Sequence, residues 1–256
     1  MKDQSEYNVR AVERALLILD CFDSENPERG VSEIAQAVDL HKATTHRIVT
    51  TLLNYGYLER TEDDQRYRLG LKLASLGCQV IDQMDLRQEA LPYMNKLVEQ
   101  WNETCDLSIF DQERVFYVEV LHSNHALTIS AAVGQRLPAY CTASGKLFLA
   151  YLPPDKLNAI LSNPMPAHTP KTITSPDKLR AELETIRQRG YSFDEGELED
   201  GIRAVAAPIR NHRGEIIATI SIPGPVNRIT PERIPEILAS LVQTTQAISN
   251  RLGWKI

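Results

Sequence analysis

The segment VSEIAQAVDLHKATTHRIVTTLLNYGYLER, residues 31–60, decides the fold expected of the N-terminal part of the chain. It contains two patterns typical of short amphipathic helices, separated by the tight turn DLH at 39–41. In the second pattern Thr45 and Leu52 share one side, and Gly56 is a natural left-handed cap at its end. Two short helices joined by a tight turn predict a helix-turn-helix.

The flanking residues extend this motif. Four apolar residues at spacings of 3, 4 and 3 mark one face of a preceding helix: Val9, Val12, Leu16 and Leu19. Residues 57–60 and 66–69 alternate as the strands of a hairpin with a polar tip. This order of elements predicts a winged helix-turn-helix over residues 1–70, whose third helix enters the major groove of DNA.

Charge supports a DNA-binding face. The chain has 28 bases and 34 acids, a net charge of −6, which excludes a broadly basic nucleic-acid coat but permits a small basic face. No acid occurs between Leu40 and Asn54. Thr45 also aligns with the buried side of its helix. The predicted base or phosphate contacts are Lys42, Thr44, Thr45, Arg47, Arg66 and Arg68. The alternative is a winged helix that only binds another protein.

The pattern changes near residues 70 and 86. Apolar residues from Leu69 to Met84 form a nearly heptad stripe, which predicts a linker and dimerisation helix over residues 71–85. Residues 86–256 mix helices with hairpins, including a strand expected at Leu127–Ala132. The fold class is therefore α+β, with an antiparallel sheet and flanking helices in the C-terminal domain.

Several function classes lack support. No apolar stretch approaches the length of a membrane span, and the N-terminus makes a poor signal peptide, so a cytoplasmic protein without a membrane partner is expected. No nucleophile–base pair, phosphate loop or dinucleotide fingerprint occurs, so we assign no catalytic residues and no cofactor. His122 and His125 lack an obvious third ligand, and we expect no metal site.

The whole chain resembles the IclR family of bacterial transcriptional regulators. Six pieces in order carry the resemblance: AVERALLIL (11–19), the segment 31–60, YRLGLKLASLG (67–77), LPAYCTASGKLFLAYL (137–152), RGYSFDEGELEDGIRAVAAPI (189–209) and GEIIATISIPGPVNRIT (214–230). The resemblance implies an N-terminal winged helix, a GAF-like effector-binding domain, and dimers or dimers of dimers on palindromic double-stranded operators. Ala43 departs from the Ser that usually begins the recognition helix.

The resemblance also implies an effector pocket. Its predicted residues are Ala143, Ser144, Asp194, Ala204 and Ser221. The first two open a helix, where free N–H groups and the helix dipole favour an anion. Ala204 replaces a frequent Cys and Pro223 a second Ser, so an aromatic acid or sugar acid is favoured over a short keto acid.

These observations predict a regulator that represses a catabolic operon and responds to a small carboxylate. Two alternatives stay open. One is a DNA-binding regulator that needs no ligand, because the pocket is filled by its own side chains. The other is an enzyme that acts on a small acid in the C-terminal domain.

Overall fold

The computed structural model describes residues 9–254 except 24, 62–64, 83–84 and 127. The chain divides into two compact units, residues 1–83 and 84–256. Each unit has its own hydrophobic core. Within the described residues no helix is long and apolar enough to cross a membrane.

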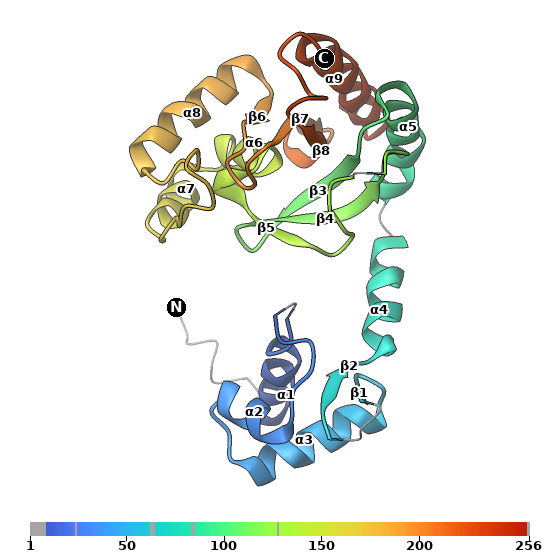
Figure 1. Ribbon diagram of the computed structural model, residues 1–256, viewed down its shortest axis with the longest axis vertical. Coiled ribbons are helices and arrows are strands. Elements are labelled where there is room, and N and C mark those ends of the chain that lie inside the picture. Colours follow the sequence, from blue (N-terminus) through green and yellow to red (C-terminus); the bar gives the residue numbers. More distant parts are fainter. Residues whose placement is uncertain (1–8, 24, 62–64, 83–84, 127, 255–256) are drawn as a thin grey trace. The chain divides into compact units, whose positions relative to one another are not determined.

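The first unit is the predicted winged helix. Its elements are α1 (Arg10–Asp20), α2 (Val31–Ala37), α3 (Lys42–Asn54), β1 (Leu58–Arg60), β2 (Tyr67–Leu69) and α4 (Leu71–Asp82), as drawn in Figure 1. Ile18, Ile34, Val49 and Leu58 bring one fully buried side chain each from α1, α2, α3 and β1 into a common core. The predicted tip of the wing at 62–64 lies outside the described residues.

A bridge that the sequence pattern did not indicate holds the wing against the helices. Arg29 pairs with Tyr67 as an isolated antiparallel bridge, through N–H···O bonds of 2.9 and 2.8 Å. Beside it, Glu33 accepts a hydrogen bond of 2.8 Å from the N–H of Gly30 at the start of α2. The segment before α2 therefore borders the hairpin.

Most of the apolar stripe predicted for α1 is exposed, although a stripe of this kind is usually the buried face of a helix. Ile18 is fully buried, whereas Val9, Val12 and Leu16 are 65%, 56% and 55% exposed. With Leu17 they line a shallow hollow on the surface of α1. An apolar helix face of this kind commonly marks an interaction surface.

The predicted stripe of the linker helix needs correction at its first residue. Leu69 closes strand β2, and α4 begins only at Leu71. Met84 lies outside the described residues. Helix α5 (Asp85–Trp101) starts the second unit, so the predicted linker 71–85 runs across the boundary between the two units.

The second unit is built around one six-stranded antiparallel sheet of order β5-β4-β3-β8-β7-β6. Its strands are β3 (Cys105–Asp111), β4 (Arg114–Leu121), β5 (Arg136–Pro138), β6 (Ser192–Asp194), β7 (Ile202–Arg210) and β8 (Ile216–Pro225). The central neighbours β3 and β8 are more than 100 residues apart in sequence, and their register pairs Asp106 with Ser221. The α+β prediction is confirmed.

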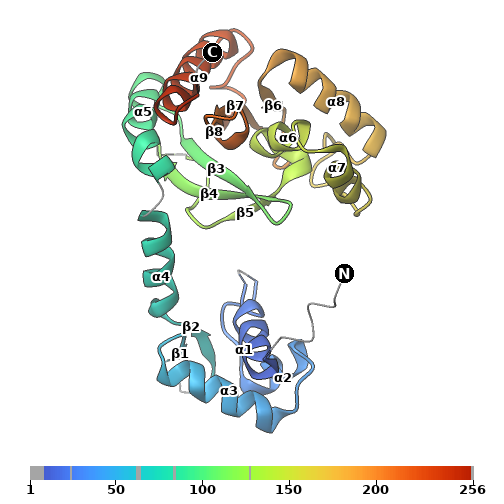
Figure 2. The same ribbon diagram turned by 180° about the vertical axis from the view of Figure 1, so that it is seen from behind.

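Helices cover both faces of this sheet (Figures 1 and 2). On one face α5 packs beside α9 (Ile234–Arg251), and their apolar side chains form a core with the strands. The opposite face carries η2 (Ala139–Cys141), α6 (Ala143–Ala150), α7 (Pro154–Leu161) and α8 (Pro176–Arg189). The sheet therefore has little solvent-facing surface.

One local prediction was wrong. Residues 128–132 are irregular, and the strand beside β4 is β5, at Arg136–Pro138. The sequence pattern also did not indicate helix α7. Pro154 is the first residue of α7, where its fixed φ and missing N–H suit a helix start.

Gly70 gives a test of the first unit. A Cβ atom there would lie 2.3 Å from the carbonyl oxygen of Gly56. We expect Gly70→Ala to lower the free energy of unfolding by about 1–3 kcal/mol, because neither backbone can yield without moving the hairpin. Hydrogen exchange of amides in residues 9–70 measures this change.

Gly77→Ala is the matched control. A Cβ at Gly77 of α4 has nothing within 4 Å, and alanine is favoured over glycine inside a helix by up to about 1 kcal/mol. Exchange should be slower or unchanged in this variant. Equal exchange in wild type and Gly70→Ala would contradict the close contact.

Candidate functional site

Helix α3 presents the predicted DNA-binding side chains. Lys42, His46 and Arg47 are exposed and Thr44 is half-buried, whereas Val49 and Leu52 are buried against the rest of the unit. No acid lies on the helix. One side of α3 is therefore anchored by apolar packing, and the other offers two permanent cations and a hydroxyl to the solvent.

The prediction for Thr45 was wrong. Its side chain is 0% exposed, and its hydroxyl donates a bond of 3.3 Å to the carbonyl oxygen of His41. A side chain in this position cannot meet a base edge while α3 stays packed. Thr45 instead belongs to the buried side of the helix, as its alignment with Leu52 indicated.

Both predicted wing arginines are exposed, and both are paired. Arg66 forms an ion pair of 2.8 Å with Glu33 and donates to the carbonyl oxygen of Glu28 at 2.9 Å. Arg68 lies 3.5 Å from Glu59. Exposed ion pairs contribute little to stability, about 0–1 kcal/mol, so a phosphate could compete for either guanidinium.

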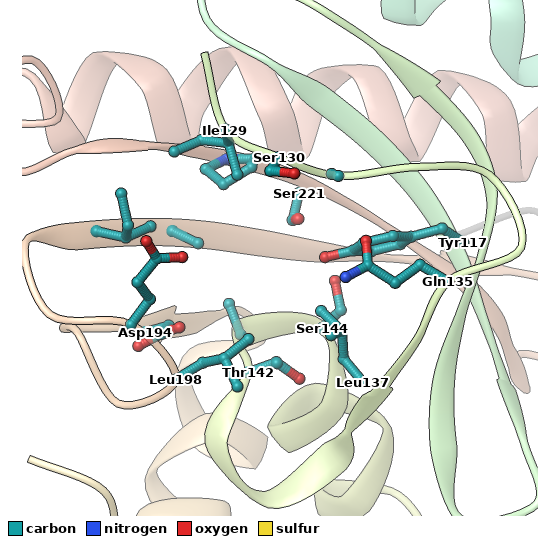
Figure 3. A pocket seen from close by; sticks show the side chains of 16 residues that line it. Tyr117, Ile129, Ser130, Gln135, Leu137, Thr142, Ser144, Asp194, Leu198 and Ser221 are labelled. Atoms are coloured by element: carbon teal, nitrogen blue, oxygen red, sulfur yellow. The ribbon is translucent and has the colours of Figure 1, made fainter. Parts of the chain in front are cut away.

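The second unit contains a cavity of about 100 Å³ on the α6 side of its sheet. All five residues predicted for the effector pocket line it: Ala143, Ser144, Asp194, Ala204 and Ser221. Figure 3 shows Asp194 on one side of the cavity and Tyr117, Gln135 and Ser144 on the other. At about 10–15 Å³ per water-sized sphere, the space admits a molecule of several heavy atoms.

The start of α6 forms one wall. Thr142 caps the helix by accepting a 3.1 Å bond from the N–H of Gly145. Gly145 packs so closely on the preceding turn that a Cβ there would lie 2.3 Å from the carbonyl oxygen of Ala139. The N–H groups of Ala143 and Ser144 belong to the first turn, where a helix supplies no acceptor of its own. The buried Ser144 Oγ has no hydrogen-bond partner among the described residues.

Asp194 lines the cavity and also holds the turn that follows β6. Its Oδ1 accepts bonds from the N–H groups of Gly196 (2.9 Å) and Glu197 (2.7 Å), which fixes the turn after β6. Burial raises the pKa of Asp194, while those N–H groups and the nearby Lys146 oppose the rise. Lys146 itself forms a buried ion pair with Glu197. Within the acidic run 194–200, Asp194 and Glu197 are therefore buried in an ordered turn, while the other acids are exposed to solvent.

The hydroxyl of Ser221 is already engaged in a hydrogen bond within the protein. Its hydroxyl donates a 2.5 Å bond to Oδ2 of Asp106, the residue opposite it on β3. Asp106 is 0% exposed, and burial raises its pKa to about 7 despite the bond from Ser221. Its other oxygen, Oδ1, has no partner among the described residues.

Sequence reasoning missed several residues that line the cavity. They are Tyr117 on β4, Ile129 and Gln135 in the segment before β5, and Leu198 after β6. The local sequence pattern did not indicate which side of the sheet Asp106 and Ser108 of β3 face. Only the pairing of β3 with β8 places these side chains inside the protein, where Ser108 bonds Thr219 at 2.8 Å.

The thiol near the cavity is unreactive. Burial and the neighbouring carboxylates raise the pKa of Cys141 to about 12, so this thiol stays protonated at neutral pH. Among the residues that the structure describes, no group of three His, Cys, Asp or Glu side chains could hold a metal ion.

The raised pKa of Asp106 predicts a pH-dependent stability. Between about pH 4 and 7 the folded chain retains a proton that the unfolded chain releases, so the free energy of unfolding falls as pH rises. The expected loss is about 4 kcal/mol. Urea unfolding followed by fluorescence reports on the second unit, since both tryptophans, Trp101 and Trp254, lie there.

Asp106→Asn removes the titrating group and provides the comparison. The difference in unfolding free energy between wild type and variant should change by about 4 kcal/mol between about pH 4 and 7. A constant difference from pH 4 to 8 would show that Asp106 titrates normally in the fold.

Two family models match this chain. Residues 11–62 match the IclR helix-turn-helix domain, and residues 78–250 match the bacterial transcriptional regulator IclR C-terminal domain. The two matched segments correspond to the winged helix and to the unit with the cavity.

Individual relatives agree over almost the whole length. The transcriptional regulator XynR of Escherichia coli K12 is 33% identical, over 96% of this chain and 98% of the relative. The transcriptional repressor IclR of the same organism is 29% identical, over 96% and 90%. An IclR homologue from Microbacterium hydrocarbonoxydans, solved in complex with 4-hydroxybenzoate, is 28% identical with a TM-score of 0.80, over 94% and 98%. The chain belongs to the IclR family of bacterial transcriptional regulators.

Proposed function

We propose that this regulator is a repressor that binds a palindromic operator as a dimer or dimer of dimers and responds to a small carboxylate in the cavity. The observation that carries the proposal is the convergence of a helix N-terminus, Asp194 and Ser221 on one enclosed space. As a DNA-binding protein of this kind acts on the chromosome, we place it in the cytoplasm.

The DNA contacts that we propose are Lys42, Thr44 and Arg47 of α3, with Arg66 and Arg68 of the wing. Lys42 and Arg47 lie on an acid-free helix in a chain that is acidic overall. Such a concentration of positive charge favours phosphates, and Arg is the commonest side chain to read guanine in the major groove.

Two copies are favoured by the apolar face of α1. Val9, Val12 and Leu16 expose a continuous stripe on the DNA-binding unit. Covering that stripe with a second copy would bury apolar surface and would place two recognition helices about a two-fold axis, which suits a palindromic site.

A carboxylate suits the cavity because most of its polar groups can donate a hydrogen bond, with Asp194 and Glu199 as the two acidic side chains of the wall. The first turn of α6 offers N–H groups, and Ser144 and Tyr117 offer hydroxyls. The solved homologue holds 4-hydroxybenzoate, an aromatic acid. Ala204 and Pro223 make the opposite wall apolar, so an aromatic acid or a sugar acid fits this cavity better than a short keto acid.

Repression is the sign of regulation that we propose. A repressor needs only to occupy its operator, whereas an activator must also present a surface to the polymerase. The relative IclR is a transcriptional repressor. The ligand would act by binding one of two conformations more tightly than the other, because equal affinity shifts no equilibrium.

Arg47→Ala tests the DNA contact. The operator is first selected from random DNA with the wild-type protein. Loss of a guanidinium that meets a base or phosphate should weaken operator binding by about 5-fold to 150-fold, since a good contact of this kind contributes about 1–3 kcal/mol. Fluorescence anisotropy measures the affinity, and light scattering verifies that the oligomer persists.

Lys178→Ala is the control for total charge. Lys178 is exposed on α8 of the second unit. Its loss changes net charge as much as the loss of Arg47 and should leave operator affinity within about twofold at moderate salt. Equal effects of the two substitutions would contradict a specific role for Arg47.

Asp194→Ala tests the pocket. A thermal-shift screen with 4-hydroxybenzoate, gluconate and pyruvate identifies a ligand of the wild-type protein. At a hundredfold excess over its Kd such a ligand stabilises the fold by about 2.7 kcal/mol. We expect the variant to bind the operator with unchanged affinity and to lose the ligand-induced shift. An unchanged ligand-induced thermal shift in the variant would contradict a role for Asp194 in ligand binding.

A further inference from the structure

Asp106 stands directly behind the wall of the cavity. It does not line the space itself, but its Oδ2 is 2.5 Å from the hydroxyl of Ser221, which does. The carboxyl group is fully buried, has no ion-pair partner among the described residues, and leaves Oδ1 without a hydrogen bond there. A buried acid joined to a ligand cavity by one hydroxyl is unexpected in a residue with a purely structural role.

We propose that Asp106 acts as a proton-dependent selector, because its protonation state decides whether the hydroxyl of Ser221 donates to Asp106 or to a ligand. The cavity then binds a carboxylate ligand only when Asp106 carries a proton. This inference rests on the proposed function, because it specifies how the same cavity admits its anion. It adds pH sensitivity to the response of the regulator.

The argument follows from the single proton of a serine hydroxyl. When Asp106 is ionised, that proton is committed to Oδ2, and the cavity meets only lone pairs of Ser221, with a buried negative charge behind them. When Asp106 is protonated, its O–H donates to Ser221 Oγ, and the serine proton turns to the ligand. The proton comes from solvent and returns to solvent when the ligand leaves.

The exchange of the hydroxyl proton between Asp106 and the ligand can take place near neutral pH. Burial brings the pKa of Asp106 to about 7, so neither form dominates at neutral pH. An anionic ligand that accepts from Ser221 stabilises the protonated form and should raise that pKa further. The anion and the ionised carboxyl thus compete for the same hydroxyl.

Other ionisable groups around Asp106 do not provide the same switch. The neighbouring Cys105 on β3 and Tyr117 on β4 are buried, and burial raises the pKa of both, so they remain neutral near pH 7. Beyond the cavity, Lys146 is paired with Glu197, and Asp194 is held by the turn after β6. His122 and His125 lie on the segment after β4 and are common to wild type and variants.

The test compares wild type with Asp106→Asn by calorimetry at pH 6 and pH 8. The probe is the strongest binder among 4-hydroxybenzoate, gluconate and pyruvate, whose carboxylates stay ionised at both values. In wild type the apparent Kd should rise about tenfold from pH 6 to 8, as the protonated fraction falls. Asn donates permanently to Ser221 Oγ, so the variant should bind as tightly at pH 8 as at pH 6.

Two further measurements sharpen the result. Titrations at pH 8 in buffers of different ionisation enthalpy should show uptake of about one proton per ligand in wild type and none in Asp106→Asn. Ser221→Ala keeps the carboxyl and removes the hydroxyl, and it should bind weakly at both pH values.

The outcomes separate the two proposals. Equal affinity at both pH values in wild type, or an identical pH dependence in wild type and Asp106→Asn, overturns the selector and leaves the carboxylate pocket standing. Absence of binding by every probe, in wild type and in Asp106→Asn, overturns the carboxylate pocket itself and the selector with it.

Discussion

A sheet covered on both faces has no solvent side for its polar residues, and the second unit is organised around this constraint. Helices α5 and α9 pack on one face, and α6 and α8 on the other. Polar side chains that point toward α6 must find partners inside the protein or face the cavity. Asp106 with Ser221 and Ser108 with Thr219 follow this rule, and Lys146 of α6 likewise pairs with Glu197 of the turn after β6.

These interior pairs contribute little net stability. Removing a charge from water costs several kcal/mol, which a buried ion pair or a hydrogen bond to a carboxylate recovers only in part. Their consequence is geometric. Asp194 fixes the turn after β6, Thr142 begins α6 beside it, and Gly145 allows that helix to lie against the preceding turn. The cavity is thereby bounded by rigid elements, which suits a site that must distinguish ligands.

In the first unit a small apolar core holds the recognition helix in place. The centre of this core is formed by Ile18, Ile34, Val49 and Leu58. The Arg29–Tyr67 bridge ties the wing to the segment before α2. With so little interior, a helix can bury only part of its apolar surface. The exposed face of α1 and the exposed polar side of α3 are therefore both available for partners, one apolar and one anionic.

The sequence by itself determined most of the elements and the class of protein. Helical spacing, turn residues and an acid-free recognition helix are local properties, so the winged helix and the α+β class could be predicted from it. The five residues proposed for the pocket came from the resemblance to a known family and not from a local pattern. Only the tertiary structure decided which sides are buried. Thr45 was misassigned because one helical turn carries both a core-facing and a groove-facing position. Most of the predicted apolar face of α1 proved exposed because Ile18, with Ala15 and Leu19 beside it, turns toward the core instead. The place of Asp106 behind the cavity follows from the pairing of β3 with β8, which brings it opposite Ser221, more than a hundred residues away in sequence. No local pattern encodes a strand register of that range.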